Sequence, residues 1–229
     1  MTELQGFGDQ IALGAFTTLR TALTSLALGI GVGLCGAAAK RSRVRIIRWL
    51  AGCYTTIVRG VPELLIILIL YFGGTVALTT VFGRYVEVDA FAAGVFALTI
   101  VFGAYATEVF RAAIQAVPSG QIEAAQALGL SRFCVWCFVI LPQMWRYALP
   151  GLGNLWLTLL KDTALISVVG LEDLMRKSSI AAGSTHDPLT FYSIAASLYL
   201  LFTSVSLVGL TWLERRADRG VVREMRRLS

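Results

Sequence analysis

Charged residues are scarce in this sequence. Asp, Glu, Lys and Arg together make up 15% of the 229 residues, whereas 56% are hydrophobic. Soluble globular domains carry about 25% charged residues, so this composition excludes an ordinary soluble domain. Several apolar runs extend over about 20 residues, enough for a helix to cross a hydrocarbon core of about 30 Å. The sequence therefore predicts an all-α integral membrane protein.

Residues suited to catalysis or metal binding are also few. Histidine occurs once, at His186, and there are four cysteines. Cys134 and Cys137 lie three residues apart, but no second pair or nearby histidine completes a zinc site, so packing on one helix face is the preferred interpretation. The chain lacks the Gly-x-x-x-x-Gly-Lys-[Ser/Thr] motif that cradles nucleotide phosphates. We expect no cofactor, no metal and no enzymatic activity in this chain.

Five spanning helices are predicted from the apolar runs. They extend over about Ile11–Ala39, Leu50–Phe82, Ala90–Ile114, Leu149–Leu171 and Phe191–Leu213. The first two runs exceed the minimum length of a span, which indicates tilt or an interfacial end. Gly29 and Gly33 lie one turn apart in the first run, the spacing at which two helix backbones approach closely.

The distribution of cations predicts the orientation of the chain. The net charge of +6 arises from Lys and Arg clustered at the ends of apolar runs. That pattern is typical of membrane topology and argues against a nucleic-acid partner. Fifteen of the 20 Lys and Arg residues fall in the first loop, the third loop and the C-terminal tail. Because cytoplasmic loops are enriched in these residues, we predict the N-terminus outside and the C-terminus in the cytoplasm.

The loop between the third and fourth spans is the longest, and it is rich in small residues. After the break at Val117–Gly120, Glu123 is expected in the first turn of a short helix, where a carboxylate suits the positive dipole end. Gly129 suits the left-handed conformation that ends such a helix. A second amphipathic stretch, Ser131–Leu141, is expected to close at Pro142. Periodicity alone leaves two interpretations open, a knob docked in a protein groove or a helix on the lipid surface.

Several motifs in this chain resemble those of one transporter family. The pattern Glu123-Ala124-Ala125, Gly129 and Val139-Ile140-Leu141-Pro142 resembles the EAA loop of ABC importer permeases, with Val139 where that family usually has Ile. Three further segments resemble signatures of polar amino-acid permeases: Arg59–Leu64, Ala104–Arg111 and Lys161–Leu165. The segments Arg146–Asn154 and Gly183–Pro188 are most similar to the Q-type permease of histidine/lysine/arginine/ornithine and opine importers.

The resemblance implies a single transmembrane domain over residues 1–229, of the five-helix, MetI-like kind found in type I ABC importers. Residues 115–145 would form its cytoplasmic coupling loop. The implied partners are a second permease subunit, two cytoplasmic ATPase subunits that hold ATP and Mg²⁺, and a periplasmic amino-acid-binding protein, with the bilayer of a bacterial inner membrane around the pore. The residues implied in ATPase coupling are Gly120, Glu123, Ala124, Ala125, Gly129, Leu141 and Pro142. Transport would proceed by alternating access.

Ionisable groups inside spans are costly and are therefore functional candidates. Glu108 and Arg111 lie three residues apart and can pair with each other. Asp162 is expected near the middle of the fourth span, and Glu63 is expected at the start of the second helix, where an interfacial position is an alternative. We expect Glu108 or Asp162 to compensate the charge of a basic amino acid, although a purely structural pair is an equal alternative. Thr163 and Glu63 complete the predicted substrate path.

The substrate and the assembly stay open from the sequence. A basic amino acid or opine is the favoured substrate, and glutamate, glutamine or cystine is the nearest alternative. A secondary transporter is a less favoured class, because no inverted repeat is visible and a docking loop is present. The pore could pair two copies of this chain or this chain with a paralogue, and the Q-type resemblance favours the paralogue.

Overall fold

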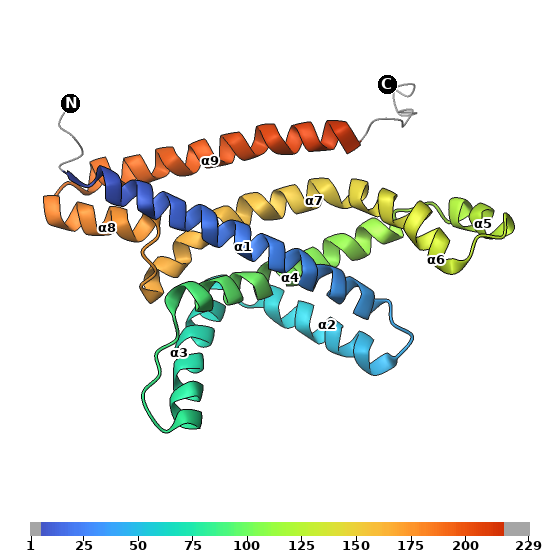
Figure 1. Ribbon diagram of the computed structural model, residues 1–229, viewed down its shortest axis with the longest axis horizontal. Helices are drawn as coiled ribbons and strands as arrows, with labels where there is room; N and C mark the ends of the chain where they lie inside the picture. Colours follow the sequence, from blue (N-terminus) through green and yellow to red (C-terminus); the bar gives the residue numbers. More distant parts are fainter. Residues whose placement is uncertain (1–5, 218–229) are drawn as a thin grey trace.

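The computed structural model describes residues 6–217, and within this range the chain consists of helices joined by loops, without strands (Figure 1). In chain order the helices are α1 Gly8–Lys40, α2 Arg45–Gly60, α3 Glu63–Phe82, α4 Ala90–Gln115, α5 Ser119–Ala127, α6 Arg132–Val135, the π-helix η2 Trp136–Ile140, α7 Leu141–Asp162, the 3₁₀-helix η3 Thr163–Val169, α8 Leu174–Thr185 and α9 Pro188–Ala217. Five segments are long and apolar enough to cross a membrane. The predicted five-span helical fold is confirmed. The tail cations Arg219, Arg223, Arg226 and Arg227 lie outside the described residues.

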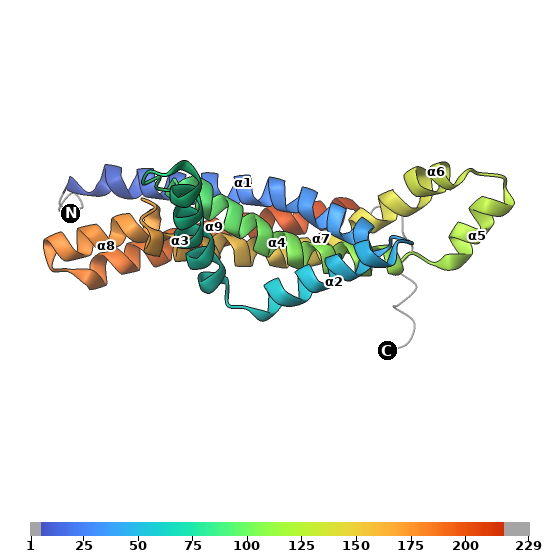
Figure 2. The same ribbon diagram turned by 90° about the horizontal axis from the view of Figure 1, so that it is seen from below.

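The pairing of α1 with α4 forms the centre of the bundle (Figure 1, Figure 2). Glycines on α1 make the close approach possible. A Cβ on Gly29 would lie 2.5 Å from the Phe102 ring, and one on Gly33 would lie 2.7 Å from the Ala106 Cβ. The predicted close approach of a helix at these two glycines is therefore confirmed, and its partner is α4.

The second apolar run was predicted as one helix, but the structure divides it into two. Helix α2 ends at Gly60 and α3 begins at Glu63. Val61 is extended, at φ −109° and ψ 137°, because the ring of Pro62 disfavours a helical conformation for the residue before it. From this break α3 projects away from the long helices, whereas α2 stays beside them (Figure 1, Figure 2). The break brings the N-terminal end of α3 to the bundle.

The fourth span also differs from the prediction, because it begins well before Leu149. The span runs over Arg132–Val169, through α6, η2, α7 and η3. Pro142 does not close a helix as expected. It lies in the first turn of α7 directly after the π-turn, where the Leu141 amide donates to the carbonyl of Trp136, five residues back. The wider turn accommodates a residue without an amide hydrogen, so the helix continues.

The connection after the fourth span contains a short helix, α8, rather than only a loop. Asp173 caps α8 by accepting from the Arg176 amide at 2.9 Å. The Leu174 amide donates to Thr18 Oγ1 at 3.1 Å, which ties the start of α8 to α1. Helix α9 packs on α8 and α7 and is otherwise exposed, as expected of a helix at the lipid-facing edge of a bundle.

Candidate substrate cavity and coupling helix

A cavity of about 180 Å³ lies where α3, α4 and α7 meet. Most of its wall is apolar, and two carboxylates, Glu63 and Asp162, are the charged groups in it. The lining residues are Glu63, Leu98, Val101, Phe102, Tyr105, Leu155, Thr158, Leu159 and Asp162. A concave, mostly apolar site with a few convergent polar groups is the usual form of a small-molecule pocket.

Both carboxylates stand at breaks in spanning helices. Glu63 is the first residue of α3, directly after the Val61–Pro62 break. Asp162 is the last residue of α7, where the helix tightens into the 3₁₀-helix η3. The sequence predicted Asp162 near the middle of the fourth span. The structure instead places it at the end of the regular helix α7. Interrupted helices at membrane depth are typical of sites that bind a transported substrate.

The electrostatics of the cavity favour a cation. Two carboxylates in one low-dielectric cavity repel each other, and a positive charge between them relieves that repulsion. The Tyr105 hydroxyl donates to Glu63 Oε1 at 3.4 Å, and the Arg59 guanidinium lies 5.3 Å from the centre of the Tyr105 ring. No lysine or arginine belongs to the lining.

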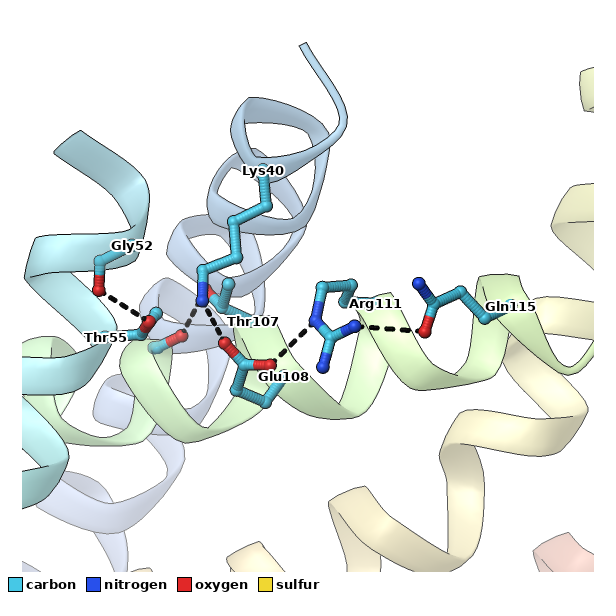
Figure 3. Close-up of polar contacts among 8 residues, drawn as sticks. Lys40, Gly52, Thr55, Thr107, Glu108, Arg111 and Gln115 are labelled. Atoms are coloured by element: carbon cyan, nitrogen blue, oxygen red, sulfur yellow. Dashed lines mark hydrogen bonds and ion pairs between the residues drawn. The ribbon is translucent and has the colours of Figure 1, made fainter. Parts of the chain in front are cut away.

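Glu108 lies in a separate ion-pair cluster and does not line the cavity (Figure 3). It accepts from Lys40 Nζ, at the end of α1, and from Arg111 Nε at 2.8 Å. Arg111 also donates to Gln115 Oε1 at 3.0 Å. The pairing of Glu108 with Arg111 is confirmed, whereas Lys40, counted only as a loop cation, is a partner that the sequence did not indicate.

Thr163 is also absent from the cavity lining. Its side chain is fully buried, and its hydroxyl donates to the Leu160 carbonyl at 2.7 Å. Of the four predicted path residues, the structure brings Glu63 and Asp162 together and places Glu108 and Thr163 elsewhere. Tyr105 and Thr158 line the cavity but were not predicted as path residues, because only the pairing of α4 with α7 gives them a shared surface.

A second candidate site is the short helix α5, which lies at one end of the molecule (Figure 1, Figure 2). Its C-terminus is a Schellman motif: the Gly129 amide donates to the Gln126 carbonyl at 2.9 Å and the Leu130 amide to the Ala125 carbonyl at 3.1 Å. Gly129 has φ +81°, so its predicted left-handed conformation is confirmed. Glu123 lies in the second turn, one turn later than expected, because α5 begins at Ser119.

The surface of α5 is available to a partner. Glu123, Ala124 and Gly120 are exposed, whereas Ala125 packs against the rest of the protein. Leu128 is 81% exposed, which is unusual for a leucine beside a well-formed helix cap. Leu141 and Pro142, predicted at the end of the loop, instead occupy the first turn of α7 and are also exposed.

One side-chain bond joins α5 to the fourth span. Gln143 on α7 donates to Gln121 Oε1 at 2.6 Å, and its amide nitrogen also donates to the Val139 carbonyl at 2.9 Å. Because α7 begins beside α5 and ends at Asp162, a single helix connects α5 to the cavity.

This arrangement of helices is that of a permease from an ATP-driven importer. The MetNI methionine ABC transporter in an inward-facing conformation superposes with a TM-score of 0.77 at 18% identity, covering 96% of this chain and all of that one, which establishes the fold. The chain belongs to the family of binding-protein-dependent transport system inner membrane components, whose sequence profile matches residues 14–219. It is therefore a permease subunit of an ABC importer and a component of the inner membrane.

Similar proteins cover nearly the whole chain. The nopaline transport system permease protein NocQ of Agrobacterium fabrum is 50% identical over 222 residues, 94% of each chain. The histidine/lysine/arginine/ornithine transport system permease protein HisQ of Escherichia coli K12 is 43% identical, covering 96% of this chain and 98% of that one. A crystal structure of an amino-acid ABC transporter with histidines has a TM-score of 0.82 at 36% identity, over 91% of this chain and 94% of that one.

Proposed function

We propose that this permease carries basic amino acids or opines, and that the cavity lined by Glu63 and Asp162 receives their positive charge. The observation that carries the proposal is the pairing of two carboxylates, without a lysine or arginine, in the lining of one apolar cavity. The names of similar permeases support it, since they specify nopaline, or histidine, lysine, arginine and ornithine. An acidic substrate such as glutamate would be repelled by the same two groups.

The proposed assembly follows from the family. This chain pairs with a paralogous permease subunit, two ATPase subunits bind ATP and Mg²⁺ on the cytoplasmic side, and a periplasmic protein delivers the amino acid. ATP hydrolysis then belongs to the ATPase chains, and this chain has no enzymatic role. The proposed orientation has the N-terminus outside and the C-terminus in the cytoplasm, so that the segment 115–145 meets the ATPase.

The proposed coupling mechanism uses the exposed face of α5. Closure of the ATPase subunits moves α5, and the Gln121–Gln143 bond and the Schellman-capped turn carry the displacement into α7. Helix α7 then shifts Asp162 relative to Glu63, which changes the access and the affinity of the cavity. The proposed coupling residues are Gly120, Glu123, Ala124, Ala125, Gly129, Leu141 and Pro142.

The test is substrate competition in the reconstituted importer, containing this chain, its partner permease, the ATPase and the binding protein. Lysine, arginine or histidine should each reduce uptake of labelled arginine, and glutamate should not. Asp162→Asn should lower arginine uptake at least tenfold while the ATPase still co-purifies. Glu172→Gln, which removes an exposed carboxylate outside the cavity, is the matched control and should transport normally. Uptake of labelled glutamate, glutamine or cystine, with no uptake of labelled arginine, would contradict the proposal.

A further inference from the structure

The turn between α1 and α2 and the first turns of α2 form a surface that the rest of the described chain leaves uncovered. Between residues 41 and 50, every residue except Ser42 is exposed. Four of the exposed residues are arginines and five are large apolar residues: Arg41, Arg43, Arg45, Arg48, Val44, Ile46, Ile47, Trp49 and Leu50. We call these residues the α2 entry surface. Trp49 is 65% and Ile46 69% exposed, so the surface exposes apolar and cationic groups together.

The positive charge of this surface is not neutralised within the described part of the chain. The sequence contains no Asp or Glu between Asp9 and Glu63. Among residues 6–217, the side-chain hydrogen bond made by these four arginines is that of Arg48, which donates to the backbone carbonyl of Ser42 at 3.4 Å. The neighbouring Lys40 differs, because it is paired with Glu108. An uncompensated cluster of four guanidinium groups is complementary to an anionic surface.

The cationic and apolar residues are ordered around the helix. At about 100° per residue, Arg45 and Arg48 lie on one side of α2, and Ile46 and Leu50 lie on the adjacent side. Trp49 falls between these two sides. Tryptophan at such a boundary is typical of helices at a bilayer interface, where the indole sits at the level of the headgroups. An amphipathic helix with arginine on its polar side also has the composition of a membrane-surface helix.

The length of α1 places this surface at the right depth. Helix α1 has 33 residues, so it is about 50 Å long at 1.5 Å per residue. A bilayer with its headgroups is about 40–45 Å thick, around a hydrocarbon core of about 30 Å. Because α1 spans the core, its ends reach the headgroup layers, and the α2 entry surface adjoins one of these ends. This holds whichever way the chain is oriented.

We propose that the α2 entry surface binds the headgroups of anionic phospholipids, with the arginines on the phosphates, Ile46 and Leu50 in the adjoining acyl region, and Trp49 at the boundary between them. The apolar half of the surface favours lipid over the acidic surface of a soluble partner, because a helix docked only on a soluble protein would not require exposed Trp49 and Ile46 beside the cations.

The test uses the full-length chain in which Trp136, Trp145, Trp156 and Trp212 are replaced by Phe, so that Trp49 is the one tryptophan left in the sequence. At equal mole fractions in reconstituted vesicles, brominated phosphatidylglycerol should quench Trp49 at least twofold more than brominated phosphatidylcholine. The triple variant Arg43→Gln, Arg45→Gln, Arg48→Gln should lose that preference. Arg84→Gln, an exposed arginine after α3, should keep it.

A second measurement keeps the test independent of the tryptophan replacements. In chains that keep all five tryptophans, native mass spectrometry should show fewer retained phosphatidylglycerol molecules for the triple arginine variant than for Arg84→Gln. Equal quenching by the two brominated lipids would overturn the proposal. So would the absence of quenching by either, which would assign the surface to a protein contact, or a preference that survives loss of the three arginines.

Discussion

Four acidic side chains of this protein lie in three different environments. Glu108 is neutralised by Lys40 and Arg111 (Figure 3), so it holds α1 and α4 together. Glu63 and Asp162 face an apolar cavity without a cation in its lining. Asp173 is fully buried outside the membrane-spanning segments; one carboxylate oxygen caps α8, and the other has no hydrogen-bond partner.

The Asp173 environment predicts how stability depends on pH. Burial raises the pKa of the Asp173 carboxyl to about 6, against the backbone hydrogen bonds that lower it. The unfolded chain has an Asp pKa of about 3.9. Between these two values the folded state binds the proton and the unfolded state does not, so stability rises as pH falls from about 7 toward 4, by at most about 3 kcal/mol. Arg176 and Tyr199 lie near this carboxyl.

The measurement is the thermal unfolding midpoint of the purified chain in detergent at pH 5 and pH 7.5. The wild-type midpoint should be several degrees higher at pH 5. Asp173→Asn preserves the helix cap, since Asn is also a good N-cap residue, and it should make the two midpoints nearly equal. A wild-type midpoint that is higher at pH 7.5, or a pH difference that persists in Asp173→Asn, would refute this assignment.

In the proposed mechanism, coupling depends on helix α5, and the geometry of its C-terminal turn rests on one residue. Gly129 has φ +81°, a conformation that a β-branched residue adopts only with strain of about 1–3 kcal/mol. Gly129→Val should therefore disrupt the Schellman turn and the placement of Leu128, with loss of ATPase co-purification. The spanning helices do not depend on this turn, so the helical content by circular dichroism should stay unchanged.

Asparagine provides the matched control for this turn. Because Asn tolerates the left-handed conformation, Gly129→Asn should retain most of the ATPase binding and transport that Gly129→Val loses. If both variants assemble and transport normally, the α5 turn is not needed for coupling.

The helices differ in how well the sequence predicts them. The left-handed Gly129 and the close approach at Gly29 and Gly33 follow from local rules, because each depends on the absence of a side chain at one position. The two halves of Leu50–Phe82 were predicted as one helix because hydropathy is continuous across Pro62. The extension of the fourth span back to Arg132 was missed because Pro142 reads as a helix end, whereas a π-turn just before it lets the helix continue.

At the scale of the whole molecule, helix α7 connects the exposed helix α5 to the cavity. Gln143 near its start contacts α5, and Asp162 at its end lines the cavity opposite the start of α3. The sequence predicted Glu63 and Asp162 as candidates separately, from their charge inside apolar runs. It could not predict that they share a cavity, since that depends on how α3, α4 and α7 meet, nor that Glu108 is diverted to Lys40 at the end of α1.

In the proposed function, the cavity carboxylates recognise the positive charge of the substrate. The most direct measurement is the ratio of arginine to citrulline uptake, because citrulline is the uncharged analogue of arginine with nearly the same shape. The ratio is compared between wild type and Glu63→Gln, Asp162→Asn in importers reconstituted with the same binding protein, so that selection by that protein cancels. We predict that the ratio falls at least tenfold in the double variant, because the variant loses charge recognition and keeps the shape of the cavity. An unchanged ratio would contradict charge recognition by Glu63 and Asp162.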